Sequence, residues 1–482
     1  MRTAGILMPV ASLPSKSGVG DFGENAYRFV DELSEMGMGI WQILPLNPLG
    51  YGNSPYQPYS SFAGDELYVD LTALQKESWI TSEIINLESQ PEKIEYNLVR
   101  EYKHRYLREA FENFQMQEEK EPAYIKFLKM DWVYGYGVFY ALKKQNDMKC
   151  WNEWPKEQQD WILDKKYDIS HLVDEIQYQI FLQFEFWKQW KRLKEYANQK
   201  NIQIMGDVPF YVGIDSLDVW TGREDFLLDA EGKPSFIAGV PPDYFSETGL
   251  RWGNPIYNWE NMKKDQYKFW VKRLEYSSQL YDVIRIDHFR AFDTYWKIPA
   301  SCRTAEEGDW IEAPGYEVLD TIIKKIPGIH MVAEDLGDLR PEVLKLRDHF
   351  NLAGMNIAEF SVLNKKSAVT NQLIYTGTHD NQTVKGWYHQ AGKSEKKKIR
   401  RRLSRLGGRK WSVSWKMIAY ICGSSADIAI IPMADFLERD DSARLNTPGT
   451  VGSPNWEWKL QSLDGMKAYR KRIQNILSRT RR

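Results

Sequence analysis

Eight short apolar runs, each bounded by Gly, Pro or Asp, are spread along this chain and have the length of β-strands. Stretches with helical spacing, such as 25–36 and 341–349, separate most of them. Apolar strands that alternate with helices indicate a parallel sheet covered on both faces. The expected strands are residues 4–10, 40–46, 203–212, 283–287, 330–334, 355–360, 373–378 and 428–433.

Eight such units predict the α/β class and a closed (β/α)8 TIM barrel, in which helices surround a ring of strands. An open doubly wound sheet is the alternative, although no G-x-G-x-x-G motif follows an early strand. The 482 residues suffice for one large barrel with insertions, or for two or three ordinary domains.

Two connections between expected strands are too long for simple crossovers. We expect an inserted helical subdomain, rich in Glu, Lys, Trp and Tyr, at about 72–198. A loop insertion with many Gly, Pro and aromatic residues is expected at about 214–259, on the face where such barrels have their active sites. The sequence therefore predicts a single barrel domain over 1–482 with these insertions and no C-terminal β-domain.

Composition argues against several classes of protein. The 64 Lys and Arg nearly balance 66 Asp and Glu, so the chain has no overall field for nucleic acid or an anionic membrane. Three scattered cysteines fit neither a disulfide framework nor a zinc motif, and we expect a cytoplasmic protein. Residues 4–10 are interpreted as a strand and not a signal peptide, and no apolar run approaches the ~20 residues of a membrane span. The basic runs 396–410 and 467–482 have helical spacing and are interpreted as solvated barrel helices.

Charged side chains stand at the ends of three expected strands. Asp287 ends the fourth strand two residues after Arg285, and side chains two apart on a strand point the same way. An arginine next to an aspartate keeps the acid ionised. Glu334 ends the fifth strand, and His379 and Asp380 follow the seventh. In a barrel these ends share one face, so the sequence predicts an active site there.

An ionised carboxylate and a protonated carboxylic acid are the minimum equipment for cleaving a glycosidic bond with retention. Asp287 is expected to be the nucleophile, because Arg285 favours its charged form. Glu334 follows an apolar strand and lies outside that pair, so we expect a raised pKa that suits a general acid and base. Asp380 is expected to bind sugar hydroxyls and to support the positive charge of the transition state.

Two other interpretations of these residues stay open. In the first, oxygen and nitrogen ligands from Asp207, Asp287, His288, Glu334, His379 and Asp380 hold a metal ion. Against it, Arg285 would lie beside a divalent cation, and no histidine pair has i,i+4 spacing. In the second interpretation, the acids only cap strand ends. We expect neither a metal nor a cofactor.

Many short motifs, each weak alone, are together highly specific. They are Leu13-Pro14-Ser15, 18–23, 41–46, 54–57, 61–64, 206–209, 238–245, 252–255, 285–290, 333–337, 378–381 and 445–450. Because these motifs occur together in this order and span the chain essentially end to end, the chain resembles the 4-α-glucanotransferases (amylomaltases or disproportionating enzymes). That family is a branch of the α-amylase-like retaining barrel enzymes.

The resemblance implies transfer of α-1,4-glucan segments to glucose or malto-oligosaccharides, with retention and without a metal. It implies Asp287 as nucleophile, Glu334 as general acid/base and Asp380 as transition-state stabiliser. Further residues implied to bind or support the sugar are Tyr56, Asp207, Trp252, Arg285, His379 and Asn446. An α-glucan hydrolase on the same barrel is the alternative, and we expect a monomer or weak homo-oligomer.

The chain departs from the family pattern at two places. Leu250 and Arg251 follow Thr248-Gly249 where the family usually has a Gln, and Ala434 stands where a Gln is common. Each departure removes an amide that would contact the substrate.

Transfer also requires that a sugar acceptor outcompetes water for the glycosyl-enzyme. This takes a preference of roughly 10⁴-fold in rate, or about 5–6 kcal/mol in activation free energy. The segment 238–255, with Tyr244, Phe245 and Trp252, is a candidate lid that excludes water.

Overall fold

The computed structural model describes residues 2–117, 119–242, 247–337, 339–364, 368–408 and 410–482. Its main sheet has eight strands in the order β10-β11-β12-β1-β2-β3-β6-β9, and every neighbouring pair is parallel. A parallel bridge between Val332 and Ala353 links β9 to the segment before β10 and brings the ring close to closure. The predicted eight-stranded α/β barrel is confirmed. The strands are β1 Thr3–Leu7, β2 Ile40–Gln42, β3 Gln203–Val208, β6 Val283–Ile286, β9 Met331–Ala333, β10 Gly354–Ile357, β11 Gln372–Tyr375 and β12 Ile428–Pro432.

All eight expected strands are present, but most are shorter than their apolar runs. β2 ends at Gln42, while Ile43 and Leu46 remain buried beyond it. Burial does not require ladder hydrogen bonds, so an apolar run can extend past its strand. The prediction of a strand to residue 360 was wrong at that end, because β10 stops at Ile357 and helix α14 (Ala358–Asn364) begins at once. A short apolar run does not distinguish a strand from a buried helix.

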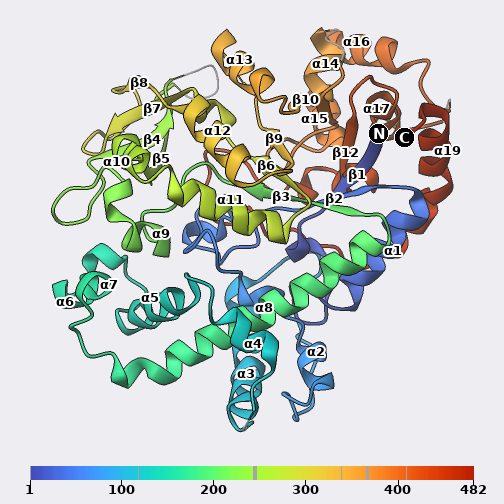
Figure 1. Cartoon of the computed structure of the whole chain (residues 1–482). Helices are drawn as coiled ribbons and strands as arrows, with labels where there is room; N and C mark the ends of the chain where they lie inside the picture. The colour runs from blue at the N-terminus through green and yellow to red at the C-terminus, as the bar shows by residue number, and fades with distance from the viewer. Residues whose placement is uncertain (1, 118, 243–246, 338, 365–367, 409) are drawn as a thin grey trace.

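Helices pack around the outside of this sheet (Figure 1). The helices expected at 25–36 and 341–349 are confirmed as α1 and α13. The basic run 396–410 overlaps α16, and the run 467–482 contains α19. Among the described residues, no helix is long and apolar enough to cross a membrane. The covering helices include α1 Glu24–Met36, α11 Lys268–Leu280, α12 Gly315–Lys325, α13 Pro341–His349, α15 Val384–Gln390, α16 Lys393–Leu403, α17 Val413–Cys422 and α19 Arg470–Thr480.

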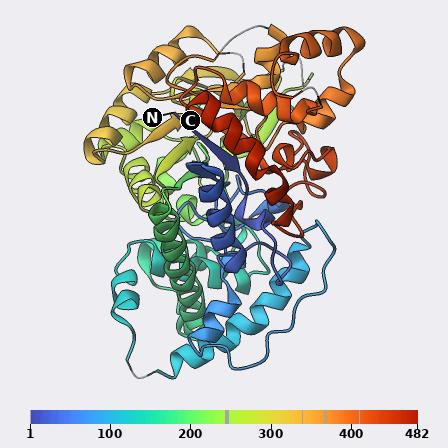
Figure 2. The ribbon, with the colours of Figure 1, turned by 90° about the vertical axis from the view of Figure 1, so that its right-hand side faces the viewer.

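The segment between β2 and β3 is mostly helical and projects below the barrel in both views (Figures 1 and 2). Its 27-residue helix α8 packs against α5 at one end and against α1 and β3 at the other. Trp190 of α8 is buried, and its indole N–H donates to the carbonyl oxygen of Leu280 at 3.1 Å. The helices here are α2 Leu71–Lys76, α3 Tyr96–Gln115, α4 Pro122–Phe127, α5 Val133–Gln145, α6 Lys156–Gln159, α7 Trp161–Asp164 and α8 Val173–Gln199.

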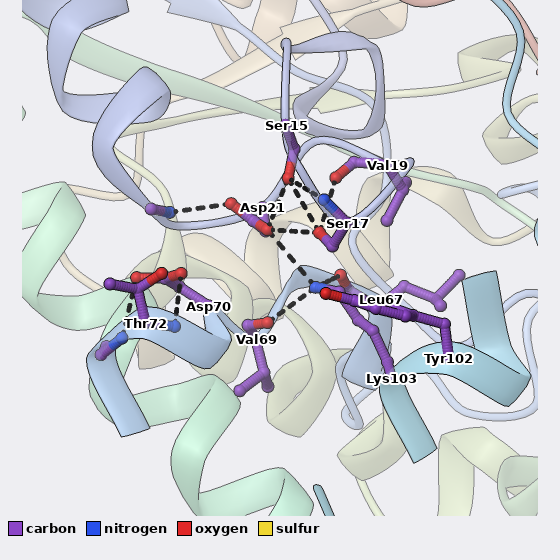
Figure 3. Close-up of polar contacts among 12 residues, drawn as sticks. Ser15, Ser17, Val19, Asp21, Leu67, Val69, Asp70, Thr72, Tyr102 and Lys103 are labelled. Carbon is purple, nitrogen blue, oxygen red and sulfur yellow. Dashed lines mark hydrogen bonds and ion pairs between the residues drawn. The ribbon is translucent and has the colours of Figure 1, made fainter. Parts of the chain in front are cut away.

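A buried lysine of α3 joins this helical segment to loops of the barrel (Figure 3). The ammonium group of Lys103 donates to the carbonyl oxygens of Leu67 at 2.6 Å and Val69 at 2.7 Å. It also lies 3.5 Å from a carboxylate oxygen of Asp21, which accepts hydrogen bonds from two serines of its own loop. One charge therefore holds together α3, the loop after β1 and the loop after β2.

A second, four-stranded sheet has the order β5-β4-β7-β8 and is antiparallel. Its strands are β4 Phe236–Val240, β5 Leu250–Pro255, β7 Thr294–Pro299 and β8 Asp309–Glu312. The segment 214–259, which we expected to be a loop, thus contains two strands and the short helix α9 (Leu217–Thr221). β4 pairs with β7, which follows β6 in the chain, and local sequence does not reveal such a distant partner. Tyr244 and Phe245 of the candidate lid lie outside the described residues.

Replacing Lys103 by Met should lower the free energy of unfolding by about 1–3 kcal/mol, because two buried carbonyls and a carboxylate lose their donor. Urea unfolding followed by circular dichroism measures the change. The matched control is Arg105→Met, since Arg105 is exposed on the same helix and should tolerate the change. Equal unfolding midpoints for the two variants would contradict this role of Lys103.

Candidate active site

The three acids expected in the site all follow strands of the barrel at their carboxyl ends. Asp287 directly follows β6, Glu334 directly follows β9, and Asp380 lies five residues after β11. β6 and β9 are neighbours, with Ile286 opposite Ala333. Asp287 and Glu334 each directly follow one residue of this pair, so both leave the sheet at the same level.

Backbone hydrogen bonds fix the carboxyl group of Glu334 against the turn that follows Asp287. One oxygen accepts the N–H of His288 at 2.8 Å, and the other accepts the N–H of Leu336 at 3.2 Å. The main chain of Glu334 also bonds to Ile286 at 3.0 Å and to Phe289 at 3.1 Å. The position of this acid is thus set by the chain that carries the other acid.

The turn itself is strained at His288. Its backbone is left-handed, with φ of 50°, an uncommon conformation for a residue with a side chain. Its N–H bond to Glu334 and the ring of Trp252, edge-on at 4.8 Å, hold it there. Burial lowers the pKa of His288 to about 4, so this ring is neutral and adds no charge beside the acids.

The protonation of Glu334 follows from its surroundings. Burial, and then the negative charge of Asp287, raise the pKa of Glu334 to about 7. Arg285 and the two backbone N–H groups act in the opposite direction. A large share of Glu334 is therefore protonated at neutral pH, as a general acid requires.

Arg285 bridges two carboxylates. One guanidinium nitrogen lies 2.7 Å from both oxygens of Asp207, and the other lies 2.9 Å from an oxygen of Asp287. Burial alone would lower the pKa of Arg285, but the two carboxylates raise it well above its ordinary value. The Arg285 side chain is 4% exposed and that of Asp287 is 28% exposed, so the cation is hidden while the carboxylate remains reachable.

A line of polar contacts leads from Asp207 towards Asp380. The hydroxyl of Tyr56 donates to Asp207 at 2.7 Å, and its ring stacks on His379 with centroids 5.1 Å apart. His379 lies 3.4 Å from one oxygen of Asp380, and the amide of Asn446 donates to the other at 2.7 Å. Seven of the nine residues that the sequence singled out are joined in one network around Arg285 and Tyr56, and the eighth, Glu334, is held beside it by the N–H of His288.

Trp252, the ninth, lies beside His288 and the loop that carries Tyr56. Its ring contacts His288, and its carbonyl oxygen accepts the side-chain amide of Gln57 at 3.1 Å. Gln57 also donates to the side-chain oxygen of Asn254 at 3.1 Å. The residue after Tyr56 thus holds β5 against the loop that carries Tyr56.

Sequence reasoning missed two residues of the site. Arg444 donates to the carbonyl oxygens of Asp380 at 2.6 Å and Asn446 at 2.7 Å, so it fixes the backbone of both. The ring of Trp456 lies 5.8 Å from that of Tyr56 and 5.9 Å from that of His379. Arg444 stands two residues before Asn446 and directly before the motif 445–450. This position was the one signal in the sequence that could have identified it.

The two departures from the family pattern lie in different surroundings. Leu250 is half-buried in β5, and the neighbouring Arg251 is exposed and donates to the carbonyl oxygen of Ala300 at 3.3 Å. Ala434 is buried and lines a small cavity together with His379 and Arg444. Alanine is shorter than the glutamine common at this position, so the small cavity remains open beside the loop that carries Asp380.

The alternative of a metal site finds no support in the arrangement of side chains. In the part of the chain that the structure describes, no group of three or more His, Cys, Asp or Glu is placed to hold a metal ion. Arg285 lies between Asp207 and Asp287, where a shared cation would have to bind.

Comparison with known proteins agrees with this geometry. The family model described as 4-alpha-glucanotransferase matches residues 8–464. A 4-alpha-glucanotransferase of Clostridium butyricum is 40% identical over 471 residues, which cover 94% of this chain and 95% of that protein. One from Thermus thermophilus is 39% identical over 479 residues and covers 95% of each.

Solved structures give the same result. The amylomaltase from Streptococcus agalactiae in complex with acarbose has a TM-score of 0.95, 34% identity and coverage of 100% of both chains. The amylomaltase from Corynebacterium glutamicum shares the fold, with a TM-score of 0.75 at 15% identity over 99% of this chain and 75% of that one. The resemblance found in the sequence motifs is confirmed, and this chain belongs to the 4-alpha-glucanotransferase family.

Proposed function

We propose that this enzyme moves segments of α-1,4-glucan onto glucose or malto-oligosaccharides through a covalent glycosyl-enzyme, with Asp287, Glu334 and Asp380 as its catalytic residues. One observation carries the proposal. Two carboxyl groups follow neighbouring strands in unlike surroundings: Arg285 pairs with Asp287 at 2.9 Å, while burial raises the pKa of Glu334 to about 7. The named relatives are transferases, so the alternative of an α-glucan hydrolase is not favoured.

In the first step, a carboxylate oxygen of Asp287 attacks the anomeric carbon of the donor. The glycosidic carbon–oxygen bond breaks, and Glu334 gives its proton to the departing oxygen. The products are a glycosyl ester on Asp287, an ionised Glu334 and a shortened glucan that leaves with a free hydroxyl.

In the second step, Glu334 takes a proton from a hydroxyl of the acceptor sugar. That oxygen attacks the anomeric carbon, the ester bond to Asp287 breaks, and Asp287 returns as a carboxylate. The two inversions retain the α configuration. Arg285 stabilises the carboxylate in the free enzyme and again as it leaves the sugar.

Asp380 supports the positive charge that develops on the sugar ring in both steps. Asn446 and His379 orient its two oxygens, and Arg444 holds its backbone, so the charge is placed before the substrate arrives. Tyr56 and Trp252 offer ring faces to the apolar sides of the glucose units, which positions the donor.

Maltotriose as the only substrate tests the transfer. The enzyme should release glucose and form a series of products longer than maltotriose, whereas hydrolysis alone gives only shorter ones. Asp287→Asn, which keeps the size of the side chain, should lower the rate by about 10³-fold or more. Full activity of that variant would contradict the nucleophile assignment.

Shortening the candidate lid within 238–255 should increase the share of donor that is hydrolysed, and an unchanged share would reject the lid.

The pH dependence tests the role of Glu334. Its pKa of about 7 belongs to an acid that must be protonated for the first step, so kcat/KM should fall about tenfold per pH unit above pH 7. Glu334→Gln should remove this alkaline decline together with most of the activity. Maltosyl fluoride, whose leaving group needs little protonation, should still react with the variant. A wild-type profile that stays flat to pH 9 would contradict the assignment.

A further inference from the structure

Positive charge is concentrated near the C-terminal end of this chain. Residues 393–410 include ten Lys and Arg and one acid, Glu395, although the net charge of the whole chain is −2. Helix α16 (Lys393–Leu403) carries most of this run. It buries Ile399 and Leu403 against its neighbours and exposes most of its cations.

Within the described residues, the cations of α16 form no ion pair with a carboxylate. Lys393, Lys397, Arg401 and Arg405 follow one another at four-residue spacing, and all four are exposed. In the described part of the chain, no ion pair involves a Lys or Arg of this run, whereas Lys324 of α12 pairs with Asp320. Like charges at this spacing destabilise a helix, so folding alone does not account for the pattern.

An open cavity of about 1040 Å³ lies between α16, α15 and α17. Ligand sites in proteins are typically about 300–1,000 Å³, so it has room for a small molecule. Three cations line it, Lys385, Arg400 and Lys416, against a single acid, Glu438. Arg400 donates from Nε to the hydroxyl of Tyr388 at 2.7 Å, and its two terminal nitrogens make no hydrogen bond among the described residues.

The α17 side of the cavity adds groups that suit a phosphate. Ser414 lies in the first turn of α17 and is 1% exposed, and it lines the cavity. Its hydroxyl makes no hydrogen bond within the described residues, so this donor remains available at the cavity. The start of α17 adds backbone N–H groups and the positive end of a helix dipole. Tyr388 and Trp411 add aromatic side chains to the lining.

We propose that this cavity binds a small phosphate ester. Arg400, Lys385 and Lys416 hold the phosphate together with the hydroxyl of Ser414, and the organic part lies against Tyr388 and Trp411. A neutral glucan would leave these cations without counter-ions. The outward row of cations on α16 raises the local concentration of anions and leads them to the cavity.

Isothermal titration calorimetry on the full chain tests the site and does not depend on glucan transfer. The probes are glucose 6-phosphate, adenosine monophosphate, inorganic phosphate and glucose. At least one of the two esters should bind about tenfold or more tightly than inorganic phosphate, and glucose should not bind. The tighter ester identifies the ring as a sugar or a nucleobase. Arg400→Ala and Lys416→Ala should each weaken binding by about tenfold or more.

Arg401→Ala is the matched control, because it removes the same charge from the outward side of the same helix. It should weaken binding by less than about threefold. The proposal is overturned if neither ester binds, if inorganic phosphate binds as well as the esters, or if Arg400→Ala and Arg401→Ala weaken binding equally. Preferred binding of a single-stranded oligonucleotide that is lost in Arg401→Ala would also overturn it, since the anion site would then lie on the outer surface.

Discussion

The bridge that Arg285 makes between Asp207 and Asp287 is the interaction on which the site depends. Three contacts of 2.7–2.9 Å place a buried guanidinium directly behind an exposed carboxylate. Two carboxylates stabilise the cation, and in return the cation orients the carboxylate of Asp287. Without Asp207 the charge of Arg285 would be buried with one partner, and without Arg285 the buried Asp207 would lose its cation.

The same arrangement explains how two chemically similar acids have different roles. Asp287 has a cation beside it, whereas Glu334 has backbone N–H groups, apolar neighbours and the charge of Asp287. The bond from His288 to Glu334 makes the distance between the acids depend on one turn of the chain. That turn is left-handed at His288, and Trp252 of the second sheet packs against it. The small antiparallel sheet is therefore part of the support of the site.

Much of this could be predicted from the sequence, because the decisive signals are local. Each strand of the barrel is an apolar run, and the acids come directly after these runs or a few residues later. What local sequence did not reveal depends on distant contacts. β4 pairs with the distant β7, and β5 is a strand through its pairing with β4. Arg444 acquires its role only where the 444–446 segment meets the Asp380 loop. The change from strand to helix at Ala358 was missed because a short apolar run fits either conformation, and the helix leaves Phe360 exposed.

The measurement that tests the central claim most directly is identification of the residue that forms the covalent intermediate. Glu334→Gln, incubated with maltosyl fluoride and quenched in acid, should accumulate a glycosyl ester because deprotonation of the acceptor is slowed. Mass spectrometry of its peptides should place the sugar on Asp287. A sugar found on Asp380, or turnover of the fluoride with no ester on any carboxylate, would contradict the account.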